Sequence, residues 1–528
     1  TVSREKDQWG EEFCFINNGV KIFAMGANYI PEDQIVTRCN EEKTRKLLAD
    51  CKAANYNFIR VWGGGYYPDG YFYDYCDENG IIVWQDFMFA CSAYLLTEEF
   101  EETVRGEVRD NVIRLRNHPS LGLWCGNNEI ESAWEYWGLP EDEEAKRDYL
   151  IIFEDIIPQV LKAYDPCENT FYWPSSPSSG GGFKDASSNH AGDMHYWDVW
   201  HNFKPIEAFR EFYYRFCSEY GFESLPDIKT CRAFADETKG DFDLCSPVMA
   251  AHQKCVQGNE KIMYYLAQMV RYPYDFKQLI YSSQLVQADC IRSNVEHMRR
   301  ARGRCMGSAY WQVNDSNPVI SWSSIDYFGR WKGLHYYAKR FYAPCLISCD
   351  DTHRKKPVLN ISNERMTAFE GIVRWKLRNN KAEILQSGEK SVSVPALTAQ
   401  NVLTIDLSDE LKNRTDPREK YLEYSIMENG KELSFGTTLF VRPKEFTFLE
   451  PAITYGISES EDKFALTFCA ENYAKSVCLS LKTADCVFSD NWFDIHGKEP
   501  VTIMIDKASL SRKMTAQELS EELEIMHN

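Results

Sequence analysis

The sequence lacks several features that would assign it to a specialised class of protein. None of its apolar runs is long enough to span a bilayer, which argues against an integral membrane protein. A basic excess is also missing. The net charge of -20 argues against nucleic acid and anionic membranes as partners, because both favour basic surfaces. No signal peptide opens the chain, so we expect a cytoplasmic protein of bacterial type, although the start TVSREKDQWG is also compatible with a removed leader.

Cysteine is abundant, but its spacing lacks the pattern of a zinc site or a disulfide framework. The 18 cysteines are scattered, no CxxC pair occurs, and the closest two are Cys345 and Cys349. Cys125, Cys217 and Cys305 lie inside apolar runs, where a free thiol behaves as a small hydrophobic group. We therefore expect reduced cysteines and an intracellular protein. No ligand-spaced set of His, Cys and Asp occurs either, so no metal or organic cofactor is expected.

The composition is that of an ordinary globular protein, and its length of 528 residues predicts two to four domains. Aromatic residues make up 14% of the chain and cluster in its first part. They can belong to a large core. However, several tryptophans follow apolar runs and stand beside polar residues, which favours stacking against a sugar. The tryptophans before residue 340 include Trp62, Trp84, Trp124, Trp134, Trp137, Trp173, Trp197, Trp200, Trp311, Trp322 and Trp331.

Short apolar runs alternate with helical patterns from residue 20 to about residue 315. Near-continuous apolar strands separated by amphipathic helices indicate a parallel sheet that is covered on both faces. Eight such units predict a (β/α)8 TIM barrel; a doubly wound sheet is the alternative, but no Gly-rich nucleotide motif follows any strand. The eight runs are KIFAMGANYI, NFIRVWGGG, GIIVWQDFMF, LGLWCGNNE, NTFYWPSSP, GDMHYWDVW, FCSEYGFES and CMGSAYWQVND. The stretch SSPSSGGG, residues 175–182, is interpreted as a mobile loop.

The pattern changes after about residue 345, where alternating strands such as GIVRWKLRNN, SVSVPAL, NVLTIDL and YLEYSIM predict antiparallel, immunoglobulin-like β-sandwiches. The tail SLSRKMTAQELSEELEIMHN is either a helix or a disordered terminus. We therefore divide the chain into a remnant of a preceding β domain, a catalytic barrel, a β-sandwich, and a second β-sandwich with a C-terminal helix or tail. Their ranges are residues 1–20, 21–345, 346–445 and 446–528.

In a (β/α)8 barrel the working residues stand at the carboxyl ends of the strands. Glu129 is the last residue of the fourth run, and Glu219 lies in the seventh at the expected end of its strand, so both carboxylates are expected at one mouth of the barrel. Two carboxylates across a cleft are what glycoside hydrolysis requires, one to donate a proton and the other to attack the anomeric carbon. Other residues at strand ends are Arg60, Trp62, Asp86, Asn128, His195, Tyr196, Trp197 and Trp311.

Three motifs carry a resemblance to a known family. They read RNHPSLGLWCGNNE, FCSEYGFESLP and YWQVNDSNPVISWSSIDYFGRWKGLHYY. Together they closely resemble the β-mannosidase branch of glycoside hydrolase family 2, and the match covers nearly the whole chain. The resemblance implies a retaining barrel with its acid/base on strand four and its nucleophile on strand seven. It implies exo-acting hydrolysis of terminal β-D-mannosyl residues from oligosaccharides or glycoconjugates through a covalent intermediate.

The resemblance also implies a role for each candidate residue. Glu129 corresponds to the acid/base, Asn128 to the residue that contacts the 2-hydroxyl, and Glu219 to the nucleophile. We expect burial to raise the pKa of Glu129, and hydrogen-bond donors from Arg60 and Tyr196 to keep Glu219 ionised. The predicted substrate-binding residues are Arg60, Trp62, Asp86, Asn128, Trp137, His195, Trp197 and Trp311.

Several of these assignments have a structural alternative. A lone Glu129 is more often a helix N-terminal carboxylate, and a lone Glu219 a member of an ion pair; the complete motifs favour catalysis in both cases. Asp86 is equally compatible with holding a neighbouring loop. Trp134 competes with Trp137 as the substrate contact.

Rival functions also stay open. Within the family they are an exo-β-glucosaminidase and an endo-β-mannosidase, and outside enzymes a non-catalytic carbohydrate-binding barrel. Members of this branch normally begin with a sugar-binding jelly roll and an immunoglobulin-like domain before the barrel. This sequence starts at what resembles the last strand of that second domain, so we expect a fragment whose activity is impaired.

Overall fold

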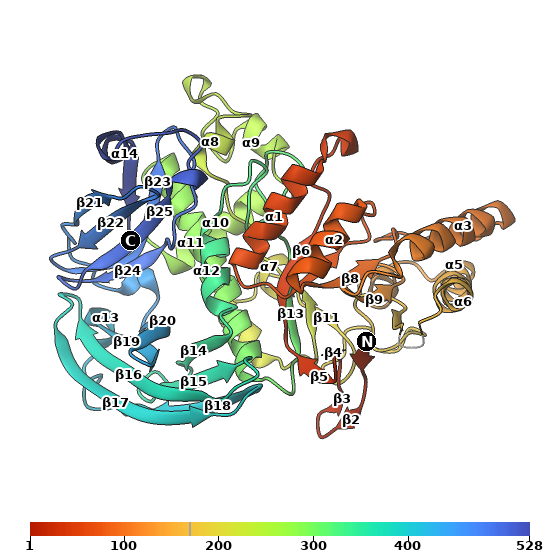
Figure 1. The fold of residues 1–528 in the computed structure, drawn as a ribbon, viewed down its shortest axis with the longest axis horizontal. Coiled ribbons are helices and arrows are strands. Elements are labelled where there is room, and N and C mark those ends of the chain that lie inside the picture. The colour runs from red at the N-terminus through yellow and green to blue at the C-terminus, as the bar shows by residue number, and fades with distance from the viewer. Residues whose placement is uncertain (168–169) are drawn as a thin grey trace. The chain divides into compact units, whose positions relative to one another are not determined.

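The chain folds into two units. The computed structural model describes residues 1–167 and 170–528, and Figure 1 shows their path. One unit consists of Thr1–Gly221 and Ser293–Asn317, and the other of Phe222–Arg292 and Pro318–Asn528. Among the described helices, none combines the length and the apolar character needed to cross a bilayer.

Eight parallel strands form the central sheet of the first unit, and each lies in one of the eight runs predicted from the sequence. The fifth run starts at residue 169, which is outside the described residues. Hydrogen-bonded neighbours follow the order β10-β9-β8-β7-β6-β13-β12-β11. The strands are β6 (Ala24–Tyr29), β7 (Phe58–Val61), β8 (Ile82–Asp86), β9 (Leu121–Cys125), β10 (Tyr172–Trp173), β11 (Met194–His195), β12 (Cys217–Glu219) and β13 (Gly307–Tyr310).

The first and the last of these strands are neighbours, which rolls the sheet into a barrel. Strand β6 pairs in parallel with β13, with Ala27 opposite Tyr310. The two ends of the ladder, β10 and β11, are joined by a side-chain bond in which Trp173 Nε1 donates to Asp193 Oδ1 over 2.8 Å. The residues of β6 are all buried, as expected for a strand covered on both faces. The predicted (β/α)8 barrel is therefore confirmed.

Helices between the strands begin at residues that the sequence marks clearly. The side chain of Asn40 caps α1 by accepting from the backbone of Lys43, and Thr97 caps α3 by accepting from Phe100. Glutamates follow each cap, where they favour the positive end of the helix dipole. The helices that lie wholly in this unit are α1 (Glu41–Ala53), α2 (Gly70–Asn79), α3 (Glu98–Leu115), α4 (Ile130–Tyr136), α5 (Glu143–Tyr149), α6 (Ile157–Tyr164) and α7 (Asp198–His201).

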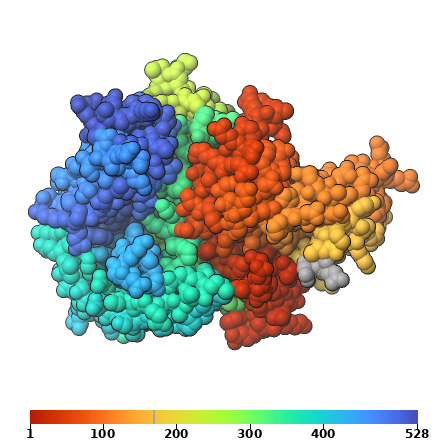
Figure 2. All heavy atoms as spheres, in the orientation of Figure 1, coloured from red at the N-terminus to blue at the C-terminus, as the bar shows by residue number. Residues whose placement is uncertain are grey.

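The first residues of the chain close the bottom of the barrel. Strands β1 (Val2–Ser3), β4 (Cys14–Asn17) and β5 (Val20–Ile22) form a small antiparallel sheet. In Figure 2 this part, dark red, lies directly against the following red residues of the barrel. The fully buried Phe13 packs its ring 5.7 Å from Trp84 and 5.6 Å from Phe216, measured between ring centres. Phe13 therefore plugs the mouth opposite the carboxyl ends of the strands.

The second unit holds helices and two antiparallel sandwiches, which confirms the predicted β-rich C-terminal part. The first sandwich packs the sheet β14-β15-β18 on the sheet β17-β16-β19-β20 around one apolar core. Its strands are β14 (Cys345–Asp350), β15 (Val358–Asn363), β16 (Phe369–Asn379), β17 (Ile384–Val394), β18 (Thr398–Thr404), β19 (Lys420–Glu428) and β20 (Lys431–Leu439). The helices of this unit include α8 (Ile228–Cys231), α9 (Pro247–Ala251), α10 (Gly258–Met269) and α12 (Gly333–Phe341), while α11 (Phe276–Arg300) extends from this unit into the first.

The second sandwich includes the tail of the chain. Thr515 and Glu518 form a reciprocal capping box at the start of α14 (Ala516–Glu522), and the residues after it become an edge strand that pairs with β23. The tail is thus a helix followed by a strand. The two sheets are β21-β22-β25 and β24-β23-β26, with β21 (Thr454–Glu459), β22 (Lys463–Cys469), β23 (Tyr473–Leu481), β24 (Phe493–His496), β25 (Val501–Asp506) and β26 (Leu523–Met526).

The plug under the barrel makes a stability prediction. Truncating Phe13 to alanine should lower the free energy of unfolding by about 3–5 kcal/mol, because it removes buried aromatic surface and leaves a cavity. Denaturant unfolding of the purified protein measures this loss. Leu95→Ala is the control, since Leu95 is 62% exposed in the same unit and its truncation should change the free energy by less than about 0.5 kcal/mol. Equal losses in the two variants would contradict the assignment of a plug.

Candidate active site

Polar side chains gather at the carboxyl ends of the barrel strands. They come from six of the eight strands or the residues directly after them, and they are joined to one another by hydrogen bonds. The sequence predicted most of this set. Its members are Asn28, Arg60, Asp86, Asn128, Glu129, His195 and Glu219.

The guanidinium of Arg60 lies at the centre of this cluster and is fully buried. Its Nη1 donates to Asn28 Oδ1 over 3.0 Å and to Glu219 Oε1 over 2.8 Å. Its Nη2 donates to Asp86 Oδ2 over 2.8 Å and to Asn128 Oδ1 over 2.6 Å. The planar fork therefore holds residues from four different strands or strand ends in fixed directions.

Arg60 keeps its charge in spite of its burial. Burial lowers the pKa of a guanidinium, but the contacts with Asp86 and Glu219 more than compensate and raise the pKa of Arg60 above its usual value. Asp86 has little capacity left for a ligand. Its oxygens also accept from Trp84 Nε1 over 2.9 Å and from the backbone of Gly63 over 3.0 Å. This geometry corresponds to the structural alternative for Asp86, the holding of a neighbouring loop.

Glu129 and Glu219 face each other closely. An oxygen of each carboxyl group and Nδ1 of His195 all lie within 4.8 Å of one another. The imidazole lies between them, with Nδ1 at 2.8 Å from Glu129 Oε1 and at 3.3 Å from Glu219 Oε2. Carboxyl groups about 5 Å apart suit a double displacement, whereas inverting enzymes need more room for a water molecule.

The three titratable groups respond to burial in opposite directions. Burial lowers the pKa of His195 to about 4, against the pull of Glu219, so the imidazole is neutral at pH 7. Burial raises the pKa of both glutamates. Only Glu219 is in direct contact with the guanidinium of Arg60, and it also accepts from Trp197 Nε1 over 3.2 Å. The two carboxyl groups thus differ in their contacts: Glu219 accepts from a guanidinium and an indole, whereas Glu129 contacts the neutral imidazole, and the charge of Glu129 further raises the pKa of Glu219.

The backbone of Glu129 is held in an unusual conformation. It has a φ of 61°, in the left-handed region that few residues other than glycine adopt, and it stands directly before α4. Its N–H donates to the carbonyl of Ser176 over 2.8 Å. In this conformation the side chain does not continue the direction of the side chains of α4. Residues with a strained backbone of this kind concentrate at functional sites. Glu129 is thus not simply a carboxylate that caps a helix, since its side chain makes no cap hydrogen bond.

The predicted tryptophans differ in their distance from the strand ends. Trp62 and Trp311 meet edge to face with ring centres 5.0 Å apart, and Trp197 bonds Glu219. Trp137 lies at the end of α4 and is 51% exposed. The ammonium of Lys146 lies 5.8 Å from the ring centre of Trp134. The structure therefore brings three of the four predicted tryptophans to the strand ends and leaves Trp137 at the surface.

The expectation that Tyr196 donates to Glu219 is wrong. Its ring packs among aromatic neighbours, with its centre 5.4 Å from that of Phe209 and 5.0 Å from that of Phe212. Only its backbone N–H reaches Glu219, whose carbonyl oxygen it contacts at 2.8 Å. Successive residues of a strand point to opposite faces, so Tyr196 turns away from the barrel mouth. The indole of Trp197 supplies the missing donor.

Four residues of this region were missed by the analysis of the sequence. Cys91 Sγ lies 3.6 Å from Glu129 Oε2 and 3.3 Å from Asn128 Nδ2. The residue as a whole is exposed, but the loss of water around its sulfur and the charge of Glu129 raise the pKa of its thiol to about 12. Asn28 could have been found from its place at the end of the first strand. Ser176 and Asp193 flank the ends of β10 and β11, and nothing in their local sequence distinguishes them from loop residues.

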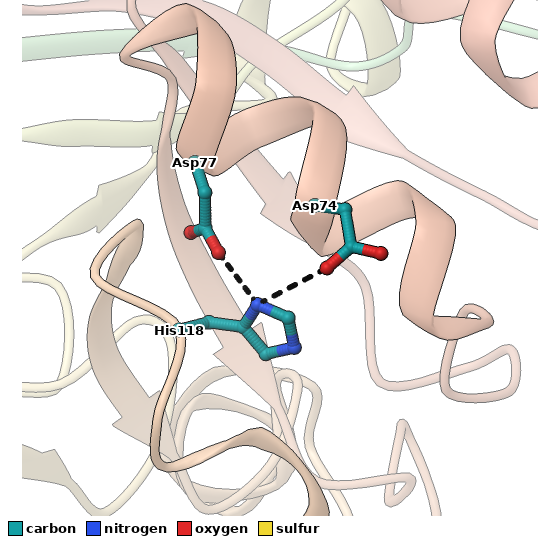
Figure 3. Close-up of side chains that lie close together, drawn as sticks. All are labelled: Asp74, Asp77 and His118. Atoms are coloured by element: carbon teal, nitrogen blue, oxygen red, sulfur yellow. Dashed lines mark hydrogen bonds and ion pairs between the residues drawn. The ribbon is translucent and has the colours of Figure 1, made fainter.

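Among the residues that the structure describes, two groups of side chains are close enough to reach one metal ion. Asp74, Asp77 and His118 form the first (Figure 3). There Asp77 is already engaged by His118 Nδ1 over 2.7 Å and by the backbone of Ser120 over 2.9 Å, so the group links a loop to α2 through ordinary hydrogen bonds. The second group is Glu129, His195 and Glu219, whose hydrogen-bonded arrangement we interpret as an acid/base cluster and not as a ligand set.

The glycine-rich stretch interpreted as a mobile loop is held by carboxylates. Glu154 accepts from the backbone of Gly182 over 2.6 Å, and Glu131 accepts from Phe183 over 2.9 Å. Glu131 lies two residues after Glu129 and is fully buried. Burial raises the pKa of Glu131 to about 7, helped by the nearby charge of Glu154.

This raised pKa predicts how stability depends on pH. The folded state binds the proton of Glu131 more tightly than the unfolded state, so the associated stabilisation is complete below about pH 4 and is lost as the pH rises through about 7. Glu131→Gln removes the effect. From pH 4 to pH 8, the free energy of unfolding of the wild type should fall relative to that of the variant by on the order of 2–3 kcal/mol. Urea unfolding across this range measures it, with Glu135→Gln on the same helix as the control; identical pH dependence in both variants would sink the prediction.

Known proteins resemble this chain in sequence and in structure. Two family models match its C-terminal part, a mannosidase Ig/CBM-like domain at residues 356–445 and an Ig-fold domain at residues 448–528. β-Mannosidase B of Aspergillus terreus is 32% identical over 533 residues, which are 96% of this chain and 62% of that protein. β-Mannosidase B of Aspergillus fumigatus is 36% identical over 396 residues, which are 72% of this chain and 46% of that protein.

Solved structures agree with these relatives. The crystal structure of a β-D-mannosidase from Dictyoglomus thermophilum superimposes with a TM-score of 0.90 at 31% identity and covers all of this chain and 63% of that one. An exo-chitosanase from Amycolatopsis orientalis has the same fold, with a TM-score of 0.75 at 16% identity. The chain spans between about half and two thirds of the length of the two fungal relatives, at 46% and 62%. The motifs, the barrel with its sandwiches and these likenesses together show that the chain belongs to the β-mannosidase branch of glycoside hydrolase family 2.

Proposed function

We propose that the protein hydrolyses terminal β-D-mannosyl residues of oligosaccharides or glycoconjugates with retention of configuration. One observation carries the proposal: an oxygen of Glu129 and an oxygen of Glu219 lie within 4.8 Å of each other, and only the carboxyl group of Glu219 is in contact with a guanidinium. Such a pair supplies an ionised nucleophile and a protonated acid at the same pH. The names of the relatives supply the sugar, mannose.

In the first step, the ionised Glu219 attacks the anomeric carbon from one face of the sugar. Glu129 transfers its proton to the glycosidic oxygen, so the bond to the leaving group breaks and an alcohol departs. A glycosyl ester on Glu219 forms. Arg60 donates to one oxygen of Glu219 and Trp197 to the other, which fixes the orientation of the attacking carboxylate.

In the second step, Glu129 acts as a base. It takes a proton from a water molecule, whose oxygen attacks the anomeric carbon and displaces Glu219. Two inversions leave the product with the configuration of the substrate. Glu129 is protonated again at the end of the cycle, and Glu219 is again a carboxylate.

Asn128 is the residue we assign to the 2-hydroxyl of the sugar. Its Oδ1 accepts from Arg60, which fixes the orientation of the amide and leaves Nδ2 as a donor on the side of Cys91. A donor beside the reacting carbon can bind the 2-hydroxyl more strongly as charge develops in the transition state. We propose that Trp62, Trp197 and Trp311 form an aromatic wall for the sugar ring.

Arg60, Asp86 and His195 act in this proposal by positioning the carboxylates. Their polar atoms are engaged with protein groups, as described above for the guanidinium and for Asp86. The reaction needs no metal or organic cofactor, since proton transfer and nucleophilic attack account for each bond that changes. The cysteines, which form no disulfide among the described residues, support a reducing compartment.

Substitution of the two glutamates tests the assignment. In the protein of full natural length, Glu219→Gln and Glu129→Ala should each lower kcat for an aryl β-mannoside by at least about a thousandfold, because they remove the nucleophile and the acid. A 2-fluoro-mannosyl fluoride should form a stable adduct on Glu219 that mass spectrometry of peptides locates.

The control for these variants is a third buried glutamate of the same unit. Glu32 also has a pKa raised by burial, but it bonds Tyr29 and Thr44 and does not belong to the cluster. Glu32→Gln should retain the adduct and most of the activity. Normal turnover by Glu219→Gln would rule out its role as the nucleophile.

A panel of substrates tests the identity of the sugar and the mode of action. We expect the aryl β-mannoside to exceed the aryl β-glucosaminide in kcat/KM by at least about a hundredfold, because the axial 2-hydroxyl must meet Asn128. Release of single mannose units from a β-mannosyl-chitobiose substrate, followed by chromatography, reports exo action. A preference for the glucosaminide would favour the exo-β-glucosaminidase alternative, and internal cleavage of a longer glycan would favour the endo-acting one.

A further inference from the structure

A buried carboxylate behind His195 has no part in the mechanism so far. Asp193 is fully buried, and its Oδ1 accepts from Trp173 Nε1 over 2.8 Å and from the backbone of Ser178 over 3.0 Å. Its Oδ2 accepts from the hydroxyls of Ser176, over 2.6 Å, and of Ser218. Every donor around Asp193 therefore points its hydrogen at the carboxylate, as expected for a group that only accepts.

The hydroxyl of Ser176 connects Asp193 to the imidazole of His195 and thereby decides which ring nitrogen carries the hydrogen. A serine hydroxyl has one hydrogen, and that of Ser176 is directed at Asp193. Its Oγ also lies 3.0 Å from Nε2 of His195. With its hydrogen already used, the hydroxyl can only accept there, so Nε2 of His195 must carry a hydrogen. A network of this kind is what assigns a histidine tautomer.

The other ring nitrogen, Nδ1, then has a lone pair, and it faces Oε1 of Glu129 at 2.8 Å and, at the longer distance of 3.3 Å, Oε2 of Glu219. His195 is neutral because burial lowers its pKa to about 4. With the hydrogen on Nε2, Nδ1 can only accept, and the atom 2.8 Å away is Oε1 of Glu129. A carboxylate at that distance would oppose one lone pair to another, whereas a carboxylic acid donates its O–H to Nδ1.

We propose that Asp193 and Ser176 are positioning residues that fix the Nε2–H tautomer of His195 and thereby keep the acid proton on Glu129. Ser176 acts on Glu129 a second time, because its carbonyl accepts the backbone N–H of that residue. The remaining polar or titratable groups around Glu129 are Arg60, Cys91, Asn128 and Glu219. The charge of Arg60 lowers the pKa of Glu129 and so favours its ionised form. The lone pair of His195 acts in the other direction, because it favours the protonated form of Glu129.

This inference rests on the proposed function for its consequence in the reaction. When Glu129 has given its proton to the leaving group, its carboxylate faces the lone pair of Nδ1. The contact is then repulsive, and it is relieved when Glu129 takes a proton from the incoming water. The same tautomer therefore assists Glu129 as an acid in the first step and as a base in the second.

The tautomer can be measured without any turnover. The full chain is labelled with ¹⁵N-histidine, and the signals of His195 are identified by their loss in His195→Gln. At pH 7 we expect Nε2 of the wild type to show the shift and the one-bond hydrogen coupling of a protonated nitrogen, and Nδ1 to show neither. A hydrogen on Nδ1, in a neutral or a charged ring, would overturn the proposal.

Two variants test the chain of bonds from Asp193. Ser176→Ala frees Nε2, so the Nδ1–H tautomer gains population and donates to an ionised Glu129. The alkaline limb of the kcat/KM profile should then move down by about one pH unit, while activity near pH 5 is retained. Asp193→Asn should turn the hydroxyl of Ser176 toward Nε2 and change the tautomer in the same direction.

The matched control is Ser175→Ala. Ser175 is a buried neighbour whose hydroxyl donates to Asn127 over 2.7 Å, with no bond to His195. Its truncation should leave the tautomer and the alkaline limb in place. An unchanged tautomer in both Ser176→Ala and Asp193→Asn would contradict the proposal. A wild type with the Nε2–H tautomer but no hydrolysis of β-mannosides would refute the proposed function alone, so the two failures are distinguishable.

Discussion

The buried guanidinium of Arg60 is the interaction on which the architecture of the site depends. A charge with no exposed surface is costly unless acceptors surround it, and here Asp86 and Glu219 supply the compensating charge while Asn28 and Asn128 fill the remaining directions. Removing one member of such a buried pair typically costs about 3–5 kcal/mol, because the partner is left without compensation. Strands far apart in the sequence are thus tied together at the point where the chemistry occurs.

The contact between Arg60 and Glu219 also makes the surroundings of the two carboxyl groups different. Burial raises the pKa of both, so neither would be a good nucleophile on its own. Arg60 stabilises the charge of Glu219 directly, whereas Glu129 faces a neutral imidazole. The two groups are coupled, so the pair titrates as a unit. We propose that its first proton leaves from Glu219, because the guanidinium of Arg60 is in direct contact with that carboxylate. Backbone strain at Glu129, with its φ of 61°, gives the side chain the direction that this arrangement needs.

The barrel and the main members of the site could be predicted from the sequence, because both follow from local patterns. Eight apolar runs gave the strands, and their ends gave Arg60, Glu129 and Glu219. Side-chain direction was harder. Tyr196 and Trp197 adjoin in sequence, yet only the indole reaches Glu219, since the turn after β11 decides which of them faces inward. Cys91, Ser176 and Asp193 could not be predicted, because their roles arise from contacts between separate loops.

The central claim is that Arg60 makes Glu219 the stronger acid of the pair. Titration of the full protein labelled with ¹³C at the glutamate carboxyl carbons measures this most directly, with signals assigned through Glu129→Gln and Glu219→Gln. The account predicts that the carboxyl signal of Glu219 changes at lower pH than that of Glu129, and that Arg60→Met moves the titration of Glu219 upward. A Glu129 that ionises first, or a titration of Glu219 that is unchanged in Arg60→Met, would contradict it.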